Sequence, residues 1–354
     1  MPARNQPKTV EENIPVITQE EFYRQYDELR PDYERLGINM QQAIKSFLGE
    51  KKIPYLDVLY RVKDAASAYE KITRKNYNSP FEQIEDWCGL RVICYYPSDV
   101  DRICEIFTTE FDVKTQEDTA SRLAPHEFGY RSTHFILTIK ESWLKPPNYR
   151  GLENLKVEVQ VRTILMHAWA EIEHKLAYKS TEQVPDQFKR QLYRLSAKFE
   201  EADEQFETLR YGLQEYRETL ANQVGEAEPF PEQEFNLDVL KIFIDKHFPH
   251  HKRSNVLSVS DVFNELLTLG LGMKEIQEAY SIGIESLPKL EARWVREAPQ
   301  HRTRLAQVGA FRMVMEVGND AYFKLRLRGR EGTDWVQSVI EEREELAKKR
   351  KPNS

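Results

Sequence analysis

The stretch VEVQVRT, Val157–Thr163, carries three polar side chains of types that can do chemistry. Glu158, Gln160 and Arg162 recur at every second residue, so in a β-strand they share one face while the valines take the other. A carboxylate, an amide and a guanidinium in one row make an unusual solvent face. A carboxylate in such a row can accept a proton or bind a cation.

A second carboxylate, Asp86, stands just before the strand-like stretch LRVICYY. Mg²⁺ needs only one or two protein carboxylates when substrate phosphates supply further oxygen ligands, so Asp86 and Glu158 together could hold the ion. Gly89, three residues after Asp86, permits a close approach or a tight turn. From the residues alone, a structural ion pair between Asp86 and Arg91 is the favoured alternative.

The stretch YRVKDAASAYEKITRK predicts a helix with a basic side. Steps of three or four residues place the following side chains together: Lys63, Ser67, Lys71, and Arg74 or Lys75, with Arg61 just before the helix. Such a face attracts phosphate. A solvated surface helix carries similar residues, and charge pattern alone does not decide between the two interpretations.

Two further stretches carry aromatic rings and imidazoles. In FGYRSTHF, Tyr130 and His134 follow a glycine and could sandwich and hydrogen-bond a base. TILMHAWAEIEHKLAYK predicts a helix with His167, Glu171, His174 and Tyr178 on one side, and with Trp169, Ile172 and Leu176 toward the core. The histidine spacing differs from HExxH, which disfavours a zinc site.

The elements that position these residues are uneven along the chain. TQEE, Thr18–Glu21, predicts the start of an N-terminal helix, and a second helix is expected to end near Gly49. Strand and helix patterns mix from about residue 52 to 179. An apolar four-three repeat then predicts one long helix over Phe188–Leu220, and the acidic, proline-containing stretch GEAEPFPEQEF predicts a linker before a mostly helical region.

Composition excludes several classes of protein. The 354 residues are 40% hydrophobic, enough for a sizeable core, and no segment is apolar enough for a membrane span. The net charge of -7 argues against a surface that binds nucleic acid everywhere. Three cysteines without a CxxC pair argue against a disulfide framework or a zinc site. We therefore expect a cytoplasmic protein without membrane contact.

Four stretches together carry a family resemblance: RVKDAASAYEKITRK, EDWCGLRV, GYRSTH and VEVQVRTILMHAWAEIEHKLAYK. In order and type they resemble the synthetase domain of the RelA/SpoT family, the alarmone synthetases. The resemblance implies an α+β fold: a nucleotidyltransferase-like mixed five-stranded sheet flanked by helices, before the long amphipathic helix and the helical C-terminal region. It implies Mg²⁺-dependent transfer of the β,γ-pyrophosphate of ATP to the ribose 3′-hydroxyl of GDP or GTP, which makes (p)ppGpp.

The resemblance also implies roles for individual residues. Asp86 matches the magnesium carboxylate, and Glu158 matches the second carboxylate, which binds metal or accepts the 3′-hydroxyl proton. Tyr130 resembles the residue that stacks on the acceptor's guanine. Positions matching the ATP site are Arg61, Lys63, Ser67, Lys71, Arg74 and Arg91. Positions matching the surroundings of the acceptor nucleoside are His134, Gln160, His167 and Glu173, while Arg162 could be structural or phosphate-facing.

One departure from the family pattern keeps alternatives open. Small alarmone synthetases usually carry lysines for the acceptor's 5′-phosphates before the glycine-tyrosine motif, whereas the stretch KTQEDTASRLAPHEFGY offers only Lys114, Arg122 and His126 as bases. An enzyme that pyrophosphorylates the 3′ end of tRNA, or an adenine nucleotide, is therefore the second hypothesis. A catalytically inactive, synthetase-like binding module is the third, although Asp86, Glu158 and Tyr130 are all present.

These observations predict four parts of the chain. Residues 1–49 form an N-terminal tail and helices, 50–182 the synthetase domain, 183–225 the long heptad helix, and 226–354 a helical region of unknown role. The apolar stripe of the long helix is expected to pack on its own chain. It could also form a homo-oligomer through residues 188–220.

Overall fold

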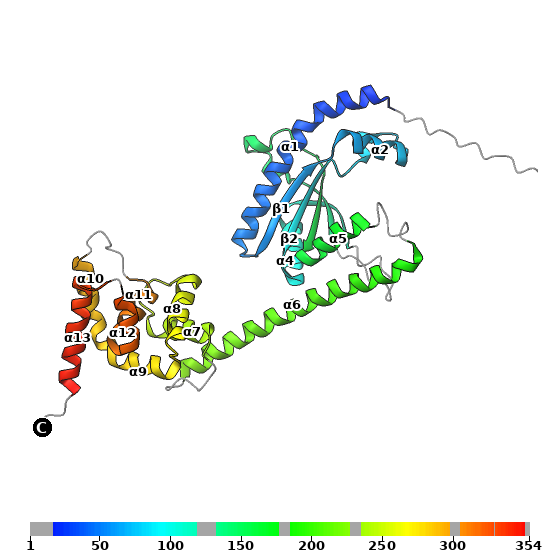
Figure 1. Ribbon diagram of the computed structural model, residues 1–354. Helices are drawn as coiled ribbons and strands as arrows, with labels where there is room; N and C mark the ends of the chain where they lie inside the picture. Colours follow the sequence, from blue (N-terminus) through cyan, green and yellow to red (C-terminus); the bar gives the residue numbers. More distant parts are fainter. Residues whose placement is uncertain are drawn as a thin grey trace, which may run out of the picture. The chain divides into compact units, whose positions relative to one another are not determined.

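The structure is a computed structural model, which describes residues 17–118, 132–176, 185–226, 235–297, 305–328 and 330–350. The chain divides into two compact units, residues 1–210 and 211–354. The named strands all lie in the first unit, and the second unit is built from helices (Figure 1). The finer division into four parts stays a prediction.

One mixed sheet of five strands organises the first unit, as expected. The strands are β1 (Tyr55–Val62), β2 (Cys88–Cys94), β3 (Asp112–Asp118), β4 (Thr133–Thr138) and β5 (Val157–Thr163). Their order is β1-β2-β5-β4-β3, in which β2 and β5 are parallel and the other neighbours antiparallel. Neither β1 nor β3 stands out in the sequence, because both are edge strands whose charged side chains interrupt the apolar pattern.

The two faces of this sheet differ in chemistry. Apolar side chains of the central strands are buried on one face with residues of α1 and α4, among them Val92, Phe135, Val157, Val159 and Val161. Because successive side chains alternate, Glu158 and Gln160 of β5 and Arg91 of β2 lie on the opposite, polar face. The row of polar residues predicted from VEVQVRT is therefore confirmed as one face of a central strand.

Helices surround the sheet. They are α1 (Gln19–Glu50), α2 (Ala65–Lys75), α3 (Pro80–Gln83), α4 (Pro97–Glu110), α5 (Ile164–Leu176) and the first part of α6 (Asp186–Glu226), with 3₁₀ turns η2 (Glu141–Trp143) and η3 (Pro147–Tyr149). The expected mixed sheet flanked by helices and followed by a long helix is thus confirmed (Figure 1).

The N-terminal helix begins where the sequence predicts. The side chain of Thr18 accepts a hydrogen bond from the backbone nitrogen of Glu21 at 3.3 Å. The prediction of a second helix ending near Gly49 is wrong, because α1 is continuous over 32 residues with Pro31 inside it. Its apolar side packs on β1 and β2, and this tertiary packing stabilises the helix across the proline.

The α5 helix is confirmed, but only part of its predicted apolar side is covered. Trp169 is buried, and its ring centroid lies 5.7 Å from that of Phe199 on α6. Ile172 and Leu176 were expected in the core, yet they are 47% and 62% exposed. Helical spacing does not reveal how far along a helix its neighbours extend.

The long helix is also confirmed, with a different covered side. Of the predicted stripe, several residues are between 40% and 56% exposed: Leu195, Phe206, Leu209, Leu213 and Tyr216. Leu192 and Leu220 of the stripe are buried, and so are Ser196 and Asp203, which do not belong to it. Between Ser196 and Arg210 the covered side is displaced by one residue from the apolar stripe.

In the second unit, the described residues after α6 form α7 (Leu237–His247), α8 (Val256–Thr268), α9 (Met273–Gly283), the 3₁₀ turn η5 (Ile284–Ser286), α10 (Leu287–Glu297), α11 (Gln307–Gly318), α12 (Asp320–Leu327) and α13 (Asp334–Arg350). Most of α11 is buried. A Cβ at Gly283 would collide with the Val314 carbonyl, and one at Gly318 with the Ala279 carbonyl. Glycine is required at both positions for α9 and α11 to approach this closely.

Two expectations about the whole chain can be compared with the described residues. No single described helix is long and apolar enough to cross a membrane, and only the pair Val256–Thr268 and Met273–Arg296, bent by 106°, meets that length and composition. Cys88, Cys94 and Cys104 are free thiols.

Candidate active site

Asp86 lies between two lysines at the start of β2. Lys63 Nζ donates to Asp86 Oδ2 at 2.8 Å, and Lys71 Nζ donates to Oδ1 at 2.9 Å. Burial opposes ionisation of this carboxyl, but the two lysines outweigh that effect and hold the pKa of Asp86 below its ordinary value. The alternative of an Asp86–Arg91 ion pair is wrong, because Asp86 binds Lys63 and Lys71, and Arg91 binds Glu171.

The predicted basic helix is in fact a strand followed by a helix. Arg61 belongs to β1, where it pairs in register with Gly89, and Lys63 follows the strand. Asp64 caps α2, its carboxylate accepting from the backbone nitrogen of Ser67 at 2.8 Å. The helical spacing of Ser67, Lys71 and Arg74 is therefore confirmed, whereas the placement of Lys63 on the helix is wrong. The strand-to-helix turn is what lets Lys63 and Lys71 reach one carboxylate.

Glu158 is held by two neighbours on the polar face. His134 Nδ1 lies 3.3 Å from Glu158 Oε1, and Gln160 Nε2 donates to the same oxygen at 3.2 Å. The hydrogen bond with His134 lowers the pKa of Glu158, burial opposes this, and Gln160 lowers the pKa further. The charge of Asp86 raises the pKa of Glu158, so the two carboxylates lie close enough to interact. Glu158 is a carboxylate at neutral pH.

The same two neighbours have unused hydrogen-bonding atoms. His134 and Gln160 are paired in register across β4 and β5. His134 Nε2 and Gln160 Oε1 are both buried and have no hydrogen-bond partner among the described residues. Buried polar atoms normally have partners, so these two point to a bound molecule. An imidazole nitrogen and an amide oxygen beside a carboxylate can recognise hydroxyl and N–H groups.

A pocket of about 320 Å³ lies over the polar face. Its lining includes Arg61, Gly89, Arg91, Glu158, Gln160 and Glu171. Gly89 lies inside β2 rather than in a turn, and it stands opposite Arg61 on one neighbouring strand and Glu158 on the other. The absence of a side chain at this position leaves room between the cation and the carboxylate.

One wall of the pocket comes from α5. Arg91 Nη1 donates to Glu171 Oε1 at 2.7 Å and lies 3.4 Å from His167 Nδ1. Burial, together with the charge of Arg91, lowers the pKa of His167, which favours a neutral imidazole. Helical spacing in the sequence places Glu171 on the same side as His167, whereas the family resemblance selects Glu173, which lies on a different side of α5 from His167. The four-residue spacing from His167 is the signal that identifies Glu171.

The remaining predicted residues lie in varied surroundings. Ser67 and Arg74 are exposed on α2. Arg162 is buried and its Nε donates to Ser132 Oγ at 3.2 Å, while burial and the like charges of Arg91 and Arg61 lower its pKa. Lys114 lies on β3, 3.9 Å from Asp112. Tyr130, Arg122 and His126 lie outside the described residues.

The two carboxylates fit a magnesium ion in donor chemistry. The described residues contain no cluster of three or more His, Cys, Asp or Glu side chains that could hold a metal. Asp86 and Glu158 thus offer two carboxylates, which suffice when nucleotide phosphates provide further oxygen ligands. Both are kept ionised by their surroundings, although Lys63 and Lys71 occupy the two oxygens of Asp86.

Known proteins share this part of the chain. A family model described as a region found in RelA / SpoT proteins matches residues 60–183. GTP pyrophosphokinase YjbM of Bacillus subtilis (strain 168) is 35% identical over 159 residues, which cover 44% of this chain and 72% of that protein. The chain belongs to the RelA/SpoT family. It is a GTP pyrophosphokinase-like transferase.

Further relatives of this RelA/SpoT protein are similar over the same part. GTP pyrophosphokinase YwaC of the same organism is 33% identical over 132 residues, covering 36% of this chain and 60% of that protein. The crystal structure of small alarmone synthetase 1 from Bacillus subtilis is 30% identical, with a TM-score of 0.45, and the match covers 54% of this chain and 98% of that one. In another crystal structure that synthetase is bound to its product pppGpp, at 28% identity and a TM-score of 0.44, with coverage of 55% and 99%.

Proposed function

We propose that this RelA/SpoT protein transfers the β,γ-pyrophosphate of ATP to the ribose 3′-hydroxyl of GDP or GTP, with Mg²⁺, and so makes (p)ppGpp in the cytoplasm. The observation that carries the proposal is the ionised Glu158, whose partners His134 and Gln160 have a nitrogen and an oxygen without a hydrogen-bond partner in the described part of the chain. A relative named GTP pyrophosphokinase, of which the chain covers 72%, supports the choice of donor and acceptor.

Glu158 is suited to activating a hydroxyl. A ribose hydroxyl is a weak nucleophile, and a carboxylate within hydrogen-bond distance can accept its proton as the new bond forms. The 3′-oxygen then bonds to the β-phosphorus, the bond from that phosphorus to the α,β-bridging oxygen breaks, and AMP leaves. Mg²⁺ held by Asp86 and Glu158 would neutralise charge on the transferring group.

The other residues of the site divide between the two nucleotides. Cationic and hydroxyl side chains would bind the ATP phosphates: Arg61, Lys63, Ser67, Lys71, Arg74 and Arg91. The fixed positive charge of the cationic side chains stabilises the negative charge on the transferring group. Side chains around the acceptor nucleoside would be Tyr130, His134, Gln160, His167 and Glu173. A neutral His167 fits such a contact, because it can donate and accept hydrogen bonds.

The described lining of the pocket contains no lysine for the acceptor's 5′-phosphates. Lys114 is near Asp112 on an edge strand, and it does not line the pocket over the polar face. An acceptor without a 5′-polyphosphate, such as the tRNA 3′ end, or an adenine nucleotide, therefore remains the second candidate. A binding module without catalysis is the third.

A transfer assay separates these candidates. The purified chain is incubated with γ-labelled ATP and Mg²⁺, and separately with GDP, GTP, unlabelled ATP or bulk tRNA as acceptor. We expect label in a guanosine tetra- or pentaphosphate and none on tRNA. Label on tRNA or on an adenine nucleotide would show that this molecule, and not GDP or GTP, is the acceptor. Nucleotide binding without any transfer would support the inactive module.

Tyr130→Ala tests the acceptor site separately. A base-stacking contact is worth roughly 1–3 kcal/mol and involves one substrate, so KM for the acceptor should rise about fivefold to a hundredfold. KM for ATP should stay near the wild-type value. If both constants rise equally in steady-state kinetics, Tyr130 does not stack on the acceptor.

The proposed homo-oligomer concerns α6. Phe206, Leu209 and Leu213 lie along one side of this helix and are exposed. We propose this side as the self-association surface, and light scattering of the wild-type chain against Leu209→Asp measures it. An unchanged molar mass would remove the proposal.

A further inference from the structure

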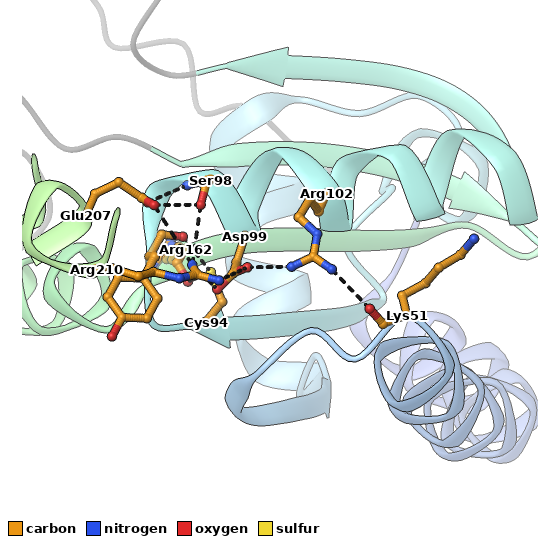
Figure 2. A network of polar contacts seen from close by, with 9 residues as sticks. Lys51, Cys94, Ser98, Asp99, Arg102, Arg162, Glu207 and Arg210 are labelled. Atoms are coloured by element: carbon orange, nitrogen blue, oxygen red, sulfur yellow. Dashed lines mark hydrogen bonds and ion pairs between the residues drawn. The ribbon is translucent and has the colours of Figure 1, made fainter. Parts of the chain in front are cut away.

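The helix α6 docks on the first unit through a cluster of polar contacts (Figure 2). Glu207 accepts hydrogen bonds from the backbone nitrogen of Ser98 at 2.9 Å and from its hydroxyl at 2.8 Å, at the first turn of α4. Arg210 Nη1 donates to Asp99 Oδ2 at 3.1 Å, and its guanidinium carbon lies 4.4 Å from the ring centroid of Tyr96. A carboxylate at a helix N-terminus and a cation over a ring both stabilise this docking.

One turn earlier, α6 makes a buried contact of a different kind. The Thr163 hydroxyl donates to Asp203 Oδ2 at 2.6 Å, and both side chains are buried, with exposures of 0% and 3%. The same hydroxyl oxygen accepts a hydrogen bond from the backbone nitrogen of Met166 at 3.1 Å. Because a hydroxyl has one hydrogen, directing it to Asp203 turns the oxygen lone pairs toward Met166. Thr163 is thereby fixed as the N-cap of α5.

The capped helix carries one wall of the pocket. His167 and Glu171 extend from α5 toward Arg91, which lies on the polar face of β2. A second contact between the helices, from Trp169 to Phe199, lies on the same stretch of α5. A line of direct contacts therefore runs from Asp203 through Thr163 and the first turn of α5 to Arg91.

We propose that Asp203 is a positioning residue for the transfer reaction: through Thr163 it fixes the first turn of α5 and so places His167 and Glu171 against Arg91. The proposal rests on the proposed function for its effect on catalysis, but its structural part stands on the contacts alone. Asp203 lies beyond residues 60–183, the part that the family model matches. The long helix is then a component of the active site rather than only a connection to the second unit.

Glu207 provides the matched control. Glu207 and Asp203 are both carboxylates of α6, one turn apart, and both dock the helix on the same unit. Among the described residues, Glu207 binds Ser98 at the start of α4 and Arg210 of its own helix, and neither partner belongs to α5. If α6 only stabilises the fold, Asp203→Ala and Glu207→Ala should have the same consequences.

Hydrogen exchange followed by mass spectrometry measures the positioning without any activity. In Asp203→Ala and in Thr163→Val, amides of residues 164–170 should exchange faster than in the wild type, because the Met166 N–H loses its fixed acceptor. In Glu207→Ala the increase should appear at residues 97–101 and not in α5. Equal exchange of the α5 amides in Asp203→Ala and Glu207→Ala would overturn the proposal.

Kinetics then test the link to the reaction. Displacement of groups around a substrate can cost on the order of a hundredfold, so kcat should fall about tenfold to a hundredfold in Asp203→Ala, more than KM rises. Asp203→Asn should recover most of the activity, since its amide oxygen still accepts from Thr163. Thr163→Val should lower kcat similarly, and the double variant should be no worse than either single one.

The outcomes for this inference and for the proposed function are distinct. Equal kcat losses in Asp203→Ala and Glu207→Ala, or additive losses in the double variant, would contradict the positioning role while the wild type stays active. A wild type that transfers no pyrophosphate would contradict the proposed function, and the exchange of the α5 amides would still decide whether Asp203 fixes that helix.

Discussion

Two groups of carboxylates lie within the first unit. They differ in whether their surroundings leave room for a ligand. The proposed catalytic carboxylates, Asp86 and Glu158, are half-buried; Asp86 contacts two lysines, and Glu158 contacts a histidine and lines a pocket. The docking carboxylates, Asp99, Asp203 and Glu207, contact α4, β5 and α6. Both groups are hydrogen-bonded and largely withdrawn from water, so burial and pairing alone do not distinguish a candidate active site from a structural one.

The pKa of Asp203 is shifted in the opposite direction from the pKa values of Asp86 and Glu158. Lysines and a histidine hold the pKa values of Asp86 and Glu158 low in spite of burial. Asp203 contacts a hydroxyl instead, and burial, reinforced by the charge of Glu207, raises its pKa to about 6. A site that must bind phosphates and activate a hydroxyl needs the first arrangement, because its carboxylates must be ionised and reachable at neutral pH.

The largest expected effect separates the two groups by activity. Glu158→Gln and Asp86→Asn should each lower pyrophosphate transfer by at least about a hundredfold, because loss of a general base alone costs roughly 10²–10⁴-fold. Asp99→Asn, the control from the docking group, should lower the melting temperature and retain most of the transfer activity. Labelled-ATP assays and thermal unfolding measure both, and near-wild-type turnover in Glu158→Gln would end the assignment.

Two positions along the apolar stripe of α6 should give the next largest effect. Phe199 contacts the buried Trp169, so Phe199→Asp should destabilise the first unit by about 3 kcal/mol, the cost of placing an unpaired charge among apolar side chains. Leu209 belongs to the same predicted stripe but is 56% exposed, and Leu209→Asp should change the free energy of unfolding by less than about 0.5 kcal/mol. Urea unfolding compares them. A similar loss in both would mean that the stripe is covered along its whole length.

The smallest expected effect concerns stability. Two Asp→Asn substitutions should change the free energy of unfolding in opposite directions. The pKa of Asp203 is raised from 3.8 to about 6, so ionisation of this residue weakens the fold as pH rises through 6, and the effect is absent below 3.8. Asp203→Asn should therefore be more stable than the wild type above pH 7, by on the order of 1–3 kcal/mol, with the difference vanishing near pH 4.

Asp86→Asn should behave in the opposite way. Its lowered pKa means that the ionised carboxylate stabilises the fold at neutral pH, and that this contribution is lost on acidification through the folded-state pKa. The variant should be less stable than the wild type at pH 7, since Lys63 and Lys71 lose their partner. Melting temperatures between pH 2 and pH 8 follow both variants, and the same sign in both at neutral pH would contradict the comparison.

Local patterns in the sequence determined much of the fold and part of the site. Alternation identified the polar row on β5, because a strand buried on one face must repeat every second residue. Thr18 and the spacing along α2 and α6 identified helices for the equivalent reason, since capping and helical periodicity are properties of neighbouring residues. Asp86 and Glu158 are identified by their type and by their position next to such elements, and their role as a pair stays a prediction.

Only the tertiary structure determined which of these segments lie next to each other. Lys63 and Lys71 reach Asp86 because β1 pairs with β2, and Glu171 reaches Arg91 because α5 returns over the polar face. Between Ser196 and Arg210 the covered side of α6 is displaced from its apolar stripe, since Thr163 and Ser98 offer polar partners to Asp203 and Glu207. Periodicity indicates which residues share one side of a helix. The surface against which that side packs is formed by residues far away in the sequence. That surface determines which side is buried, and sequence spacing carries no information about it.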